Sequence, residues 1–259
     1  MNILKKHSYL IVLLLLTFGC RSCDTVESTK IAQSEIYQDY NIEASPGSTV
    51  VSATFRVGGG TGTTVDLDAP SRVDHNGKEM TENSRTMLVG TYYSFSSGDF
   101  VGHHEFTYTN GEGRLFKNVI DLEPIQPILV PPTIGNQKVI VMLSRAVRED
   151  ESLETSIFSE TQPPAPDTNV NANRQGNTGS SETRYSVDLN QNLNSNRTAI
   201  EIDPGKLNGF IPGGAMLQIK VMRNGDLQQK AAAGGAMRYT YTSGAYNVNV
   251  LPASKKGVK

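Results

Sequence analysis

Short runs in which apolar and polar residues alternate dominate this chain, and they constrain its fold more than any other feature. The run 51–57 places Val, Ala, Phe and Val at every second position. Similar runs occur at 104–108, 116–122, 185–189, 200–202, 217–221, 237–241 and 246–250. Strict alternation is typical of half-buried strands, because successive side chains of a strand point to opposite faces. Turn residues such as Asn110-Gly111-Glu112-Gly113 lie between runs and predict hairpins.

This pattern predicts an all-β chain of two tandem immunoglobulin-like β-sandwich domains. Four prolines between residues 123 and 132 cannot sit in a central strand and predict a stiff connector. The segment Lys138–Leu143 is continuously apolar after its lysine and predicts a strand that is buried on both faces or lies at the sandwich core. Residues 159–183 are rich in Pro, Asn, Gly and Ser, so a disordered loop is expected there. The predicted divisions are a signal at 1–19, a tether at 20–34, domains at 35–123 and 137–252, a connector at 124–136 and a tail at 253–259.

Composition and charge narrow the classes of function. The chain has 259 residues, with 24 Lys and Arg against 26 Asp and Glu, for a net charge of −2. This balance argues against nucleic acid as a partner, because nucleic-acid-binding domains carry basic patches. Two cysteines and no tryptophan exclude a disulfide-rich scaffold, a cysteine-based metal site and a true immunoglobulin domain.

The first twenty residues read as an export signal. Lys5 and Lys6 precede a ten-residue apolar run from Tyr9 to Phe18, which is too short to span a bilayer as a stable helix. Gly19 and Cys20 follow the run directly. In these residues the chain resembles bacterial lipoproteins, whose signal ends in a small residue followed by cysteine. The alternative is a plain secretory signal cleaved near Gly19, in which Cys20 has no role.

The lipoprotein resemblance implies that the signal is removed before Cys20 and that this cysteine carries acyl chains such as palmitate. Several acyl chains on one residue anchor a protein stably in the lipid bilayer, whereas a single chain is marginal. Arg21 follows the cysteine, where an aspartate would retain an enteric lipoprotein at the inner membrane. The resemblance therefore favours the outer membrane over the inner one. Cys23 is expected to be an inert thiol in the tether, or else to form an intermolecular disulfide.

Few side chains form a recognisable site. Gly58–Gly62 is followed by an apparent strand and not by a helix, so a turn is expected there and not a phosphate loop. His103 and Glu105 share one face of a predicted strand and form the start of a possible metal site, with His75 as a third ligand. His104 points to the opposite face and is expected to be packed inside.

Carboxylates give an equally weak signal. Asp66 and Asp68 share one face of a predicted strand, and Asp74 lies nearby in the sequence. Calcium prefers such clustered oxygens, but the three residues follow no known calcium-loop pattern, and solvated strand ends explain them as well. Asp188 with Glu201 or Asp203 would form a hydrolytic pair only if the fold brought the two carboxylates together. Since no Gly-x-Ser-x-Gly motif occurs and both cysteines lie near the N-terminus, the chain is expected not to be an enzyme and to need no cofactor or metal.

Tyrosine is the most frequent aromatic residue, with ten copies. Tyr92 with Tyr93, and Tyr239 with Tyr241, are candidates for a stacking surface that binds a partner. Together these features predict a non-catalytic lipoprotein of the cell envelope that acts as an adhesion, scaffold or accessory module with a protein partner. The alternative is a lipoprotein that binds a glycan or peptide for an outer-membrane uptake system, which would need an aromatic-lined pocket at the domain junction.

Overall fold

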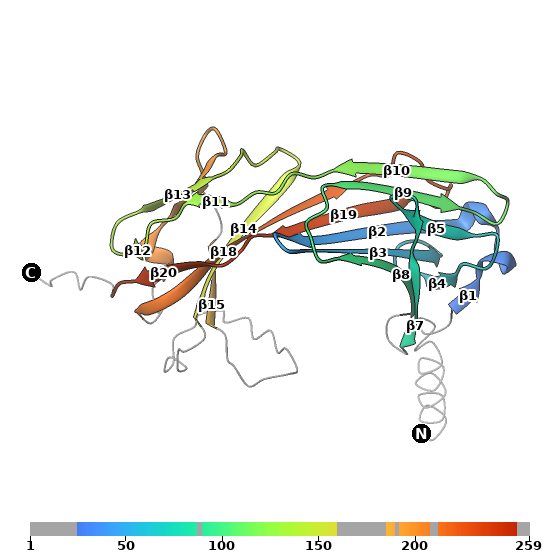
Figure 1. Cartoon of the computed structure of the whole chain (residues 1–259), viewed down its shortest axis with the longest axis horizontal. Coiled ribbons are helices and arrows are strands. Elements are labelled where there is room, and N and C mark those ends of the chain that lie inside the picture. Colours follow the sequence, from blue (N-terminus) through green and yellow to red (C-terminus); the bar gives the residue numbers. More distant parts are fainter. Residues whose placement is uncertain (1–24, 87–89, 160–184, 190–191, 208–211, 253–259) are drawn as a thin grey trace, which may run out of the picture.

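The computed structural model describes residues 25–86, 90–159, 185–189, 192–207 and 212–252 (Figure 1). The signal, Cys20, Cys23, the segment 160–184 and the tail from 253 lie outside the described residues. Three short 3₁₀ turns accompany the strands: η1 (Ser28–Lys30), η2 (Gln33–Glu35) and η3 (Pro204–Leu207). Among the residues that the structure describes, no helix is long and apolar enough to cross a bilayer.

The described strands form one long sheet and two small ones. In sheet A the main order is β1 (Thr25–Glu27), β4 (Thr63–Asp66), β3 (Ser48–Val57), β2 (Ile36–Ser45), β19 (Gly235–Thr242), β18 (Gly213–Gly225), β14 (Glu151–Ser159) and β15 (Tyr185–Leu189). Also in sheet A, β8 (Gly90–Ser97) pairs with β3 and β7 (Thr81–Thr86), and β20 (Tyr246–Val250) pairs with β18 and β12 (Thr133–Ile134).

The two small sheets have four described strands each. Sheet B has the order β10 (Leu115–Asp121), β9 (His103–Thr109), β5 (Arg72–His75) and β6 (Lys78–Glu79). Sheet C has the order β11 (Pro127–Leu129), β13 (Val139–Leu143), β17 (Ala199–Ile202) and β16 (Asn192–Leu193).

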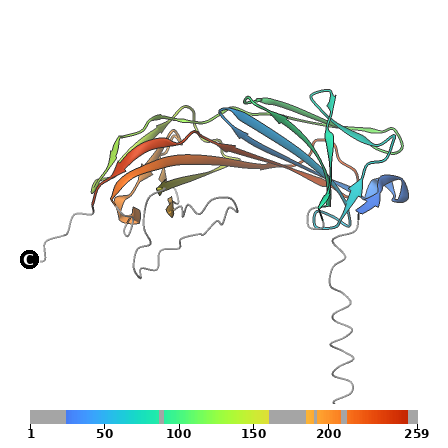
Figure 2. The same ribbon diagram turned by 60° about the horizontal axis from the view of Figure 1, so that its bottom comes forward.

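Sheets B and C both pack on sheet A, since Phe106 of sheet B and Val141 of sheet C belong to the same buried apolar cluster as Leu217 of sheet A. In β18 the alternate residues Ala215, Leu217, Ile219 and Val221 are all buried, so one face of this strand is covered along its length. The result is two β-sandwich lobes that share sheet A, and the chain bends into an arch (Figure 2). The predicted all-β fold of two β-sandwich units is confirmed.

Aromatic rings fill the space between sheets A and B. Tyr40 of β2 stacks on Phe106 of β9 with ring centroids 4.4 Å apart, and Phe55 of β3 lies 4.6 Å from Tyr108. All four rings are fully buried. The alternation at 51–57 and 104–108 predicted the inward positions of Phe55, Phe106 and Tyr108. The expected hairpin at Asn110–Gly113 is also present, because β9 and β10 pair on either side of it.

The predicted separation of the chain into residues 35–123 and 137–252 is wrong in one respect. Strand β19 returns to the N-terminal lobe, where Tyr239 pairs in parallel with Ile42 of β2. Strand β18 pairs with β20 in the C-terminal lobe and with β19 in the N-terminal lobe. The lobes are therefore joined by continuous strands as well as by the proline-rich connector, and neither is a separate domain.

Ser243 bridges the gap between β19 and β20 along the edge of β18. Its backbone N–H donates to the carbonyl of Ile219 at 2.9 Å, and its side-chain oxygen accepts the N–H of Ile219 at 3.1 Å. The hydroxyl thus replaces a backbone carbonyl where the regular ladder is interrupted. This arrangement lets the strand change direction between the lobes without leaving the N–H of Ile219 unpaired.

The predicted tether is also shorter than expected. Residues 25–35 are folded, since β1 pairs in parallel with β4 and the two turns η1 and η2 follow it. Ser28 is fully buried, and its hydroxyl donates to Ser71 and accepts the N–H of Asp68. Only residues 21–24 separate Cys20 from the folded chain.

Side-chain amides occupy the outer edge of β10. Gln228, in the loop between β18 and β19, accepts the N–H of Val119 at 2.9 Å and donates to its carbonyl at 2.7 Å. Gln229 accepts the N–H of Lys117 at 2.8 Å. These amides imitate the pairing groups of a neighbouring strand. They cover an edge that would otherwise offer unpaired backbone groups to another chain.

Candidate functional site

Three of the exposed large apolar side chains of the described residues gather on the outer face of sheet C. Ile128 is 67% exposed, Leu129 61% and Ile140 56%. Met142 lies beside them, because it points to the same side of β13 as Ile140 and pairs with Leu129. Its side chain is half-buried. We call these four residues the sheet C face. Of the two alternatives predicted for 138–143, burial on both faces is therefore wrong: Val141 and Leu143 lie in the sandwich core, while Ile140 faces solvent.

A β-bulge shapes the sheet C face. In the pairing of β11 with β13, Pro127 lies opposite Leu143 and Leu129 lies opposite Met142, so Ile128 is an extra residue. A bulge changes the direction of the side chains around it. As a result, both Ile128 and Leu129 are exposed, although consecutive residues of a regular strand would point to opposite faces.

One ion pair borders the sheet C face. Glu201 of β17 lies beside Ile140 in the pairing of the two strands, and it forms an ion pair with Lys138. Both side chains are partly exposed. This pair raises the pKa of Lys138 through its hydrogen bond and its charge interaction with Glu201. The border thus presents one positive and one negative group that neutralise each other. No hydrolytic pair is described here: Glu201 faces a lysine, and the side chain of Asp188 is outside the described part of the chain.

A polar groove lies on the opposite face of sheet A, where the hairpin of β2 and β3 meets β18 and β19. It has a volume of about 400 Å³. Its walls carry the charged groups of Glu43 and Lys220 and the hydroxyls of Thr240 and Thr242. No aromatic side chain of the described chain lines it. This groove therefore differs from the aromatic-lined pocket expected for a glycan- or peptide-binding protein.

The predicted tyrosine surface is wrong for three of its four residues. Tyr93, Tyr239 and Tyr241 are buried, and burial raises the pKa of each hydroxyl. The hydroxyl of Tyr93 accepts the N–H of Leu67 at 2.8 Å, and that of Tyr241 accepts a hydrogen bond from Gln126 at 3.3 Å. Tyr92 points to the other face of β8 and is half-buried. Alternation correctly placed the tyrosines in strands, but the inward set belongs to the core.

Two histidines meet inside the N-terminal lobe. His75 of β5 and His104 of β9 are buried, and their ring atoms Nε2 and Nδ1 lie 3.0 Å apart. The Nε2 of His104 donates to the carbonyl of Val101, so its Nδ1 must accept a hydrogen from His75. The remaining Nδ1 of His75 is buried with no partner among the described residues. Burial and the neighbouring His104 lower the pKa of His75 to about 4. The expected packing of His104 is confirmed.

The proposed metal ligands are not brought together. His103 is hydrogen-bonded to Asp121, Glu105 pairs with Lys117, and His75 points to His104 instead. Asp66 accepts a hydrogen bond from Tyr93, whereas Asp74 pairs with Arg72 in another sheet. Within the described ranges, no three His, Cys, Asp or Glu side chains are close enough to hold a metal ion. Gly58–Gly62 connects the antiparallel strands β3 and β4, as the turn prediction requires.

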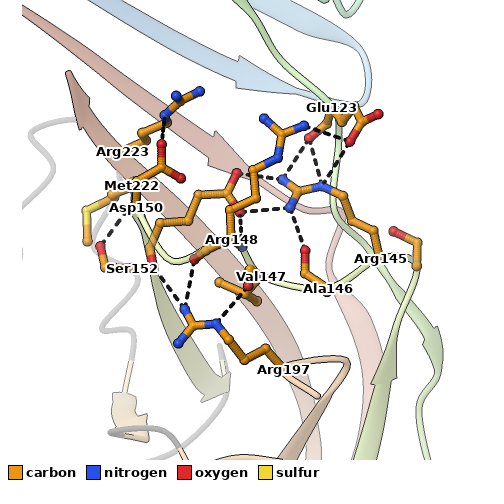
Figure 3. Close-up of polar contacts among 12 residues, drawn as sticks. Glu123, Arg145, Ala146, Val147, Arg148, Asp150, Ser152, Arg197, Met222 and Arg223 are labelled. Carbon is orange, nitrogen blue, oxygen red and sulfur yellow. Dashed lines mark hydrogen bonds and ion pairs between the residues drawn. The ribbon is translucent and has the colours of Figure 1, made fainter. Parts of the chain in front are cut away.

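A buried ion cluster joins the start of β14 to the segment just before the proline-rich connector (Figure 3). Arg145 forms two hydrogen bonds with Glu151, at 2.7 and 2.8 Å, and the N–H of Arg148 donates to the same carboxylate at 2.8 Å. Arg145 also donates to the backbone carbonyl of Glu123, just before the connector. Burial by itself would raise the pKa of Glu151, but its hydrogen bonds with Arg145 and Arg148 hold that pKa below its usual value. This cluster therefore has a structural role.

Sequence reasoning did not find the sheet C face or the histidine pair. The run Val-Ile-Val-Met-Leu was a signal for the face, but an apolar run alone does not show which residues are covered. The pairing of β5 with β9 that brings the histidines together leaves no local pattern in the sequence.

Comparison with family models and with curated proteins finds no match for this chain. Among solved structures, the chain is similar to the Yersinia pseudotuberculosis adhesin InvE, with 12% identity and a TM-score of 0.20. The alignment covers 85% of this chain and 60% of the adhesin.

Proposed function

We propose that the protein is a non-catalytic, lipid-anchored protein of the cell envelope that acts as an adhesion, scaffold or accessory module through protein contacts. The observation that carries the proposal is the sheet C face. Its four aliphatic side chains lie together on one surface, and three of them are more than half exposed. Contiguous apolar patches on folded domains mark interaction sites, because leaving them in water is unfavourable.

The shared sheet supports a scaffolding role. Strand β18 pairs with β20 in one lobe and with β19 in the other, so the two lobes keep a fixed relative orientation. A partner bound on the C-terminal lobe is then held at a set distance and angle from the N-terminal lobe. A module that positions a partner benefits from this rigidity, because less freedom is lost on binding.

Anchoring through an acylated Cys20 would hold the N-terminal lobe close to the membrane. Four residues separate Cys20 from Thr25, and even fully extended they span at most about 17 Å. The outer membrane is favoured over the inner one by the residue at position 21, as in the lipoproteins that the leader resembles.

Ligand binding is the second candidate function, and the polar groove at the bend favours it. The hydroxyls of Thr240 and Thr242, flanked by Glu43 and Lys220, suit a polar ligand such as a glycan or peptide. A glycan and peptide array probed with the purified chain tests this candidate. Binding that is lost in Thr240→Val but kept in Ile140→Lys would favour it over protein contacts at the sheet C face.

Membrane fractionation of cells tests the anchor. Cys20→Ala is expected to abolish membrane association, whereas the matched control Cys23→Ala is expected to leave it intact, because only Cys20 follows the apolar run directly. Recovery of the Cys20→Ala variant in membranes after salt and carbonate washes would overturn the anchor.

A further inference from the structure

We propose that the sheet C face binds the same face of a second copy of this chain. This inference rests on the proposed function, since it names the partner of the face that carries that function. Three properties of the face lead to it: its outward geometry, its closed edge and the charges at its border.

The outward geometry is built into the backbone. The bulge at Ile128 exposes two consecutive aliphatic residues, where a regular strand would expose one of them. With Ile140 and Met142 on the neighbouring strand, these side chains form one continuous apolar surface. Bulges of this kind occur where a fold must aim side chains at a functional surface. The apolar residues are therefore placed for contact with another surface.

The edge of β11 is unsuited to strand pairing, which leaves the face as the contact surface. Proline has no backbone N–H, and β11 begins at Pro127 and is followed by Pro131 and Pro132. An incoming strand would meet too few donors at this edge to form a ladder. On this side of sheet C, a partner is therefore expected to pack flat against the side chains, as one sheet packs on another in a sandwich.

The charges at the border favour a second copy as that partner. Lys138 and Glu201 present opposite charges side by side next to Ile140. In a two-fold symmetric dimer each copy presents the same surface, so Lys138 of one copy can lie opposite Glu201 of the other. The face therefore complements itself in both polarity and charge, and two copies do not repel each other there.

Photo-crosslinking of the full chain in cells tests this proposal. A photoreactive amino acid replaces Ile140, and the matched control carries it at Leu115, which is 59% exposed on β10 in the other lobe. The probe at position 140 is expected to give a product of twice the monomer mass that contains only this chain. The probe at position 115 is expected to give none.

Sedimentation equilibrium of the purified full-length chain in mild detergent provides the second measurement. Ile140→Lys and, independently, Leu129→Lys are expected to weaken dimerisation at least tenfold, while Leu115→Lys leaves it unchanged. Circular dichroism confirms that each variant is folded.

Each other outcome overturns the proposal in a distinguishable way. A crosslink from position 140 to a different protein would refute the second copy while leaving the proposed function in place. Crosslinks only to lipid, or none, together with a monomer mass up to about 100 μM, would refute both.

Discussion

Replacement of Glu151 by alanine is expected to destabilise the protein strongly, because this buried carboxylate binds Arg145 and the backbone of Arg148 at the start of β14. The Glu151 side chain is 3% exposed and that of Arg145 16% exposed, so both charges are largely out of water. Without the carboxylate, Arg145 and the backbone N–H of Arg148 lose three hydrogen bonds. Removing one partner leaves the other charge desolvated and uncompensated.

The expected loss in free energy of unfolding is about 3 kcal/mol. Removal of one partner of a buried ion pair costs about 3–5 kcal/mol. The lower end applies here because Arg145 keeps its hydrogen bonds to the carbonyls of Ala146 and Glu123. The matched control is Glu154→Ala on the same strand. Its side chain is 59% exposed and 3.7 Å from Lys220, so a change below about 1 kcal/mol is expected.

Urea denaturation of the purified chain measures both variants. For a slope of about 3 kcal/mol per molar urea, Glu151→Ala is expected to lower the midpoint by about 1 M. The double variant Arg145→Met/Glu151→Leu should recover much of the loss, because it leaves no unpaired charge. If Glu151→Ala and Glu154→Ala shift the midpoint equally, the structural role assigned to the buried cluster is refuted.

Three further predictions concern the edge of β10, the histidine pair and the core tyrosines. Gln228→Ala removes two hydrogen bonds to Val119 and is expected to lower the free energy of unfolding by about 1–3 kcal/mol. It also uncovers the edge of β10, so self-association is expected in sedimentation velocity. The control Lys230→Ala should have neither effect. The pKa of His75 is lowered from 6.5 to about 4, so between these pH values the unfolded chain binds more protons than the folded chain. The free energy of unfolding should therefore fall by up to about 3 kcal/mol as the pH drops from about 6.5 to about 4. A series of urea midpoints measured across this pH range should show a smaller fall in His75→Gln. The hydroxyl of Tyr239 has no partner in the described chain, so Tyr239→Phe should be neutral or stabilising, whereas Tyr241→Phe loses the bond to Gln126 and should cost about 1 kcal/mol by thermal unfolding.

Local pattern predicted the strands and their inward faces, because both depend on neighbouring residues. Phe55 and Phe106 face the core as their alternation requires, and the turn at Asn110–Gly113 joins two paired strands. The connection of the lobes was not predictable in this way. The pairing of β2 with β19 joins residues almost 200 positions apart, and parallel pairs leave no turn signal between them.

In the candidate sites, too, features set by neighbouring residues were predictable and features set by distant strand pairing were not. The sequence correctly placed His104 inside, since it follows the same alternation as Phe106. It could not show that His75 would lie against it, because that contact depends on the order of strands in sheet B. Nor could it distinguish Ile140 from Val141, since both belong to one apolar run and only the packing of sheet C against the core decides which is exposed.

The parallel pairing of β2 with β19 has a consequence for how a growing chain can fold. A chain that emerges N-terminus first presents residues 36–45 long before residues 235–242, so one edge of β2 must wait for its neighbour until nearly the whole chain is present. Pairings of such long sequence separation form slowly, because a large loop must close first. The long sheet can therefore be completed only when nearly the whole chain is present.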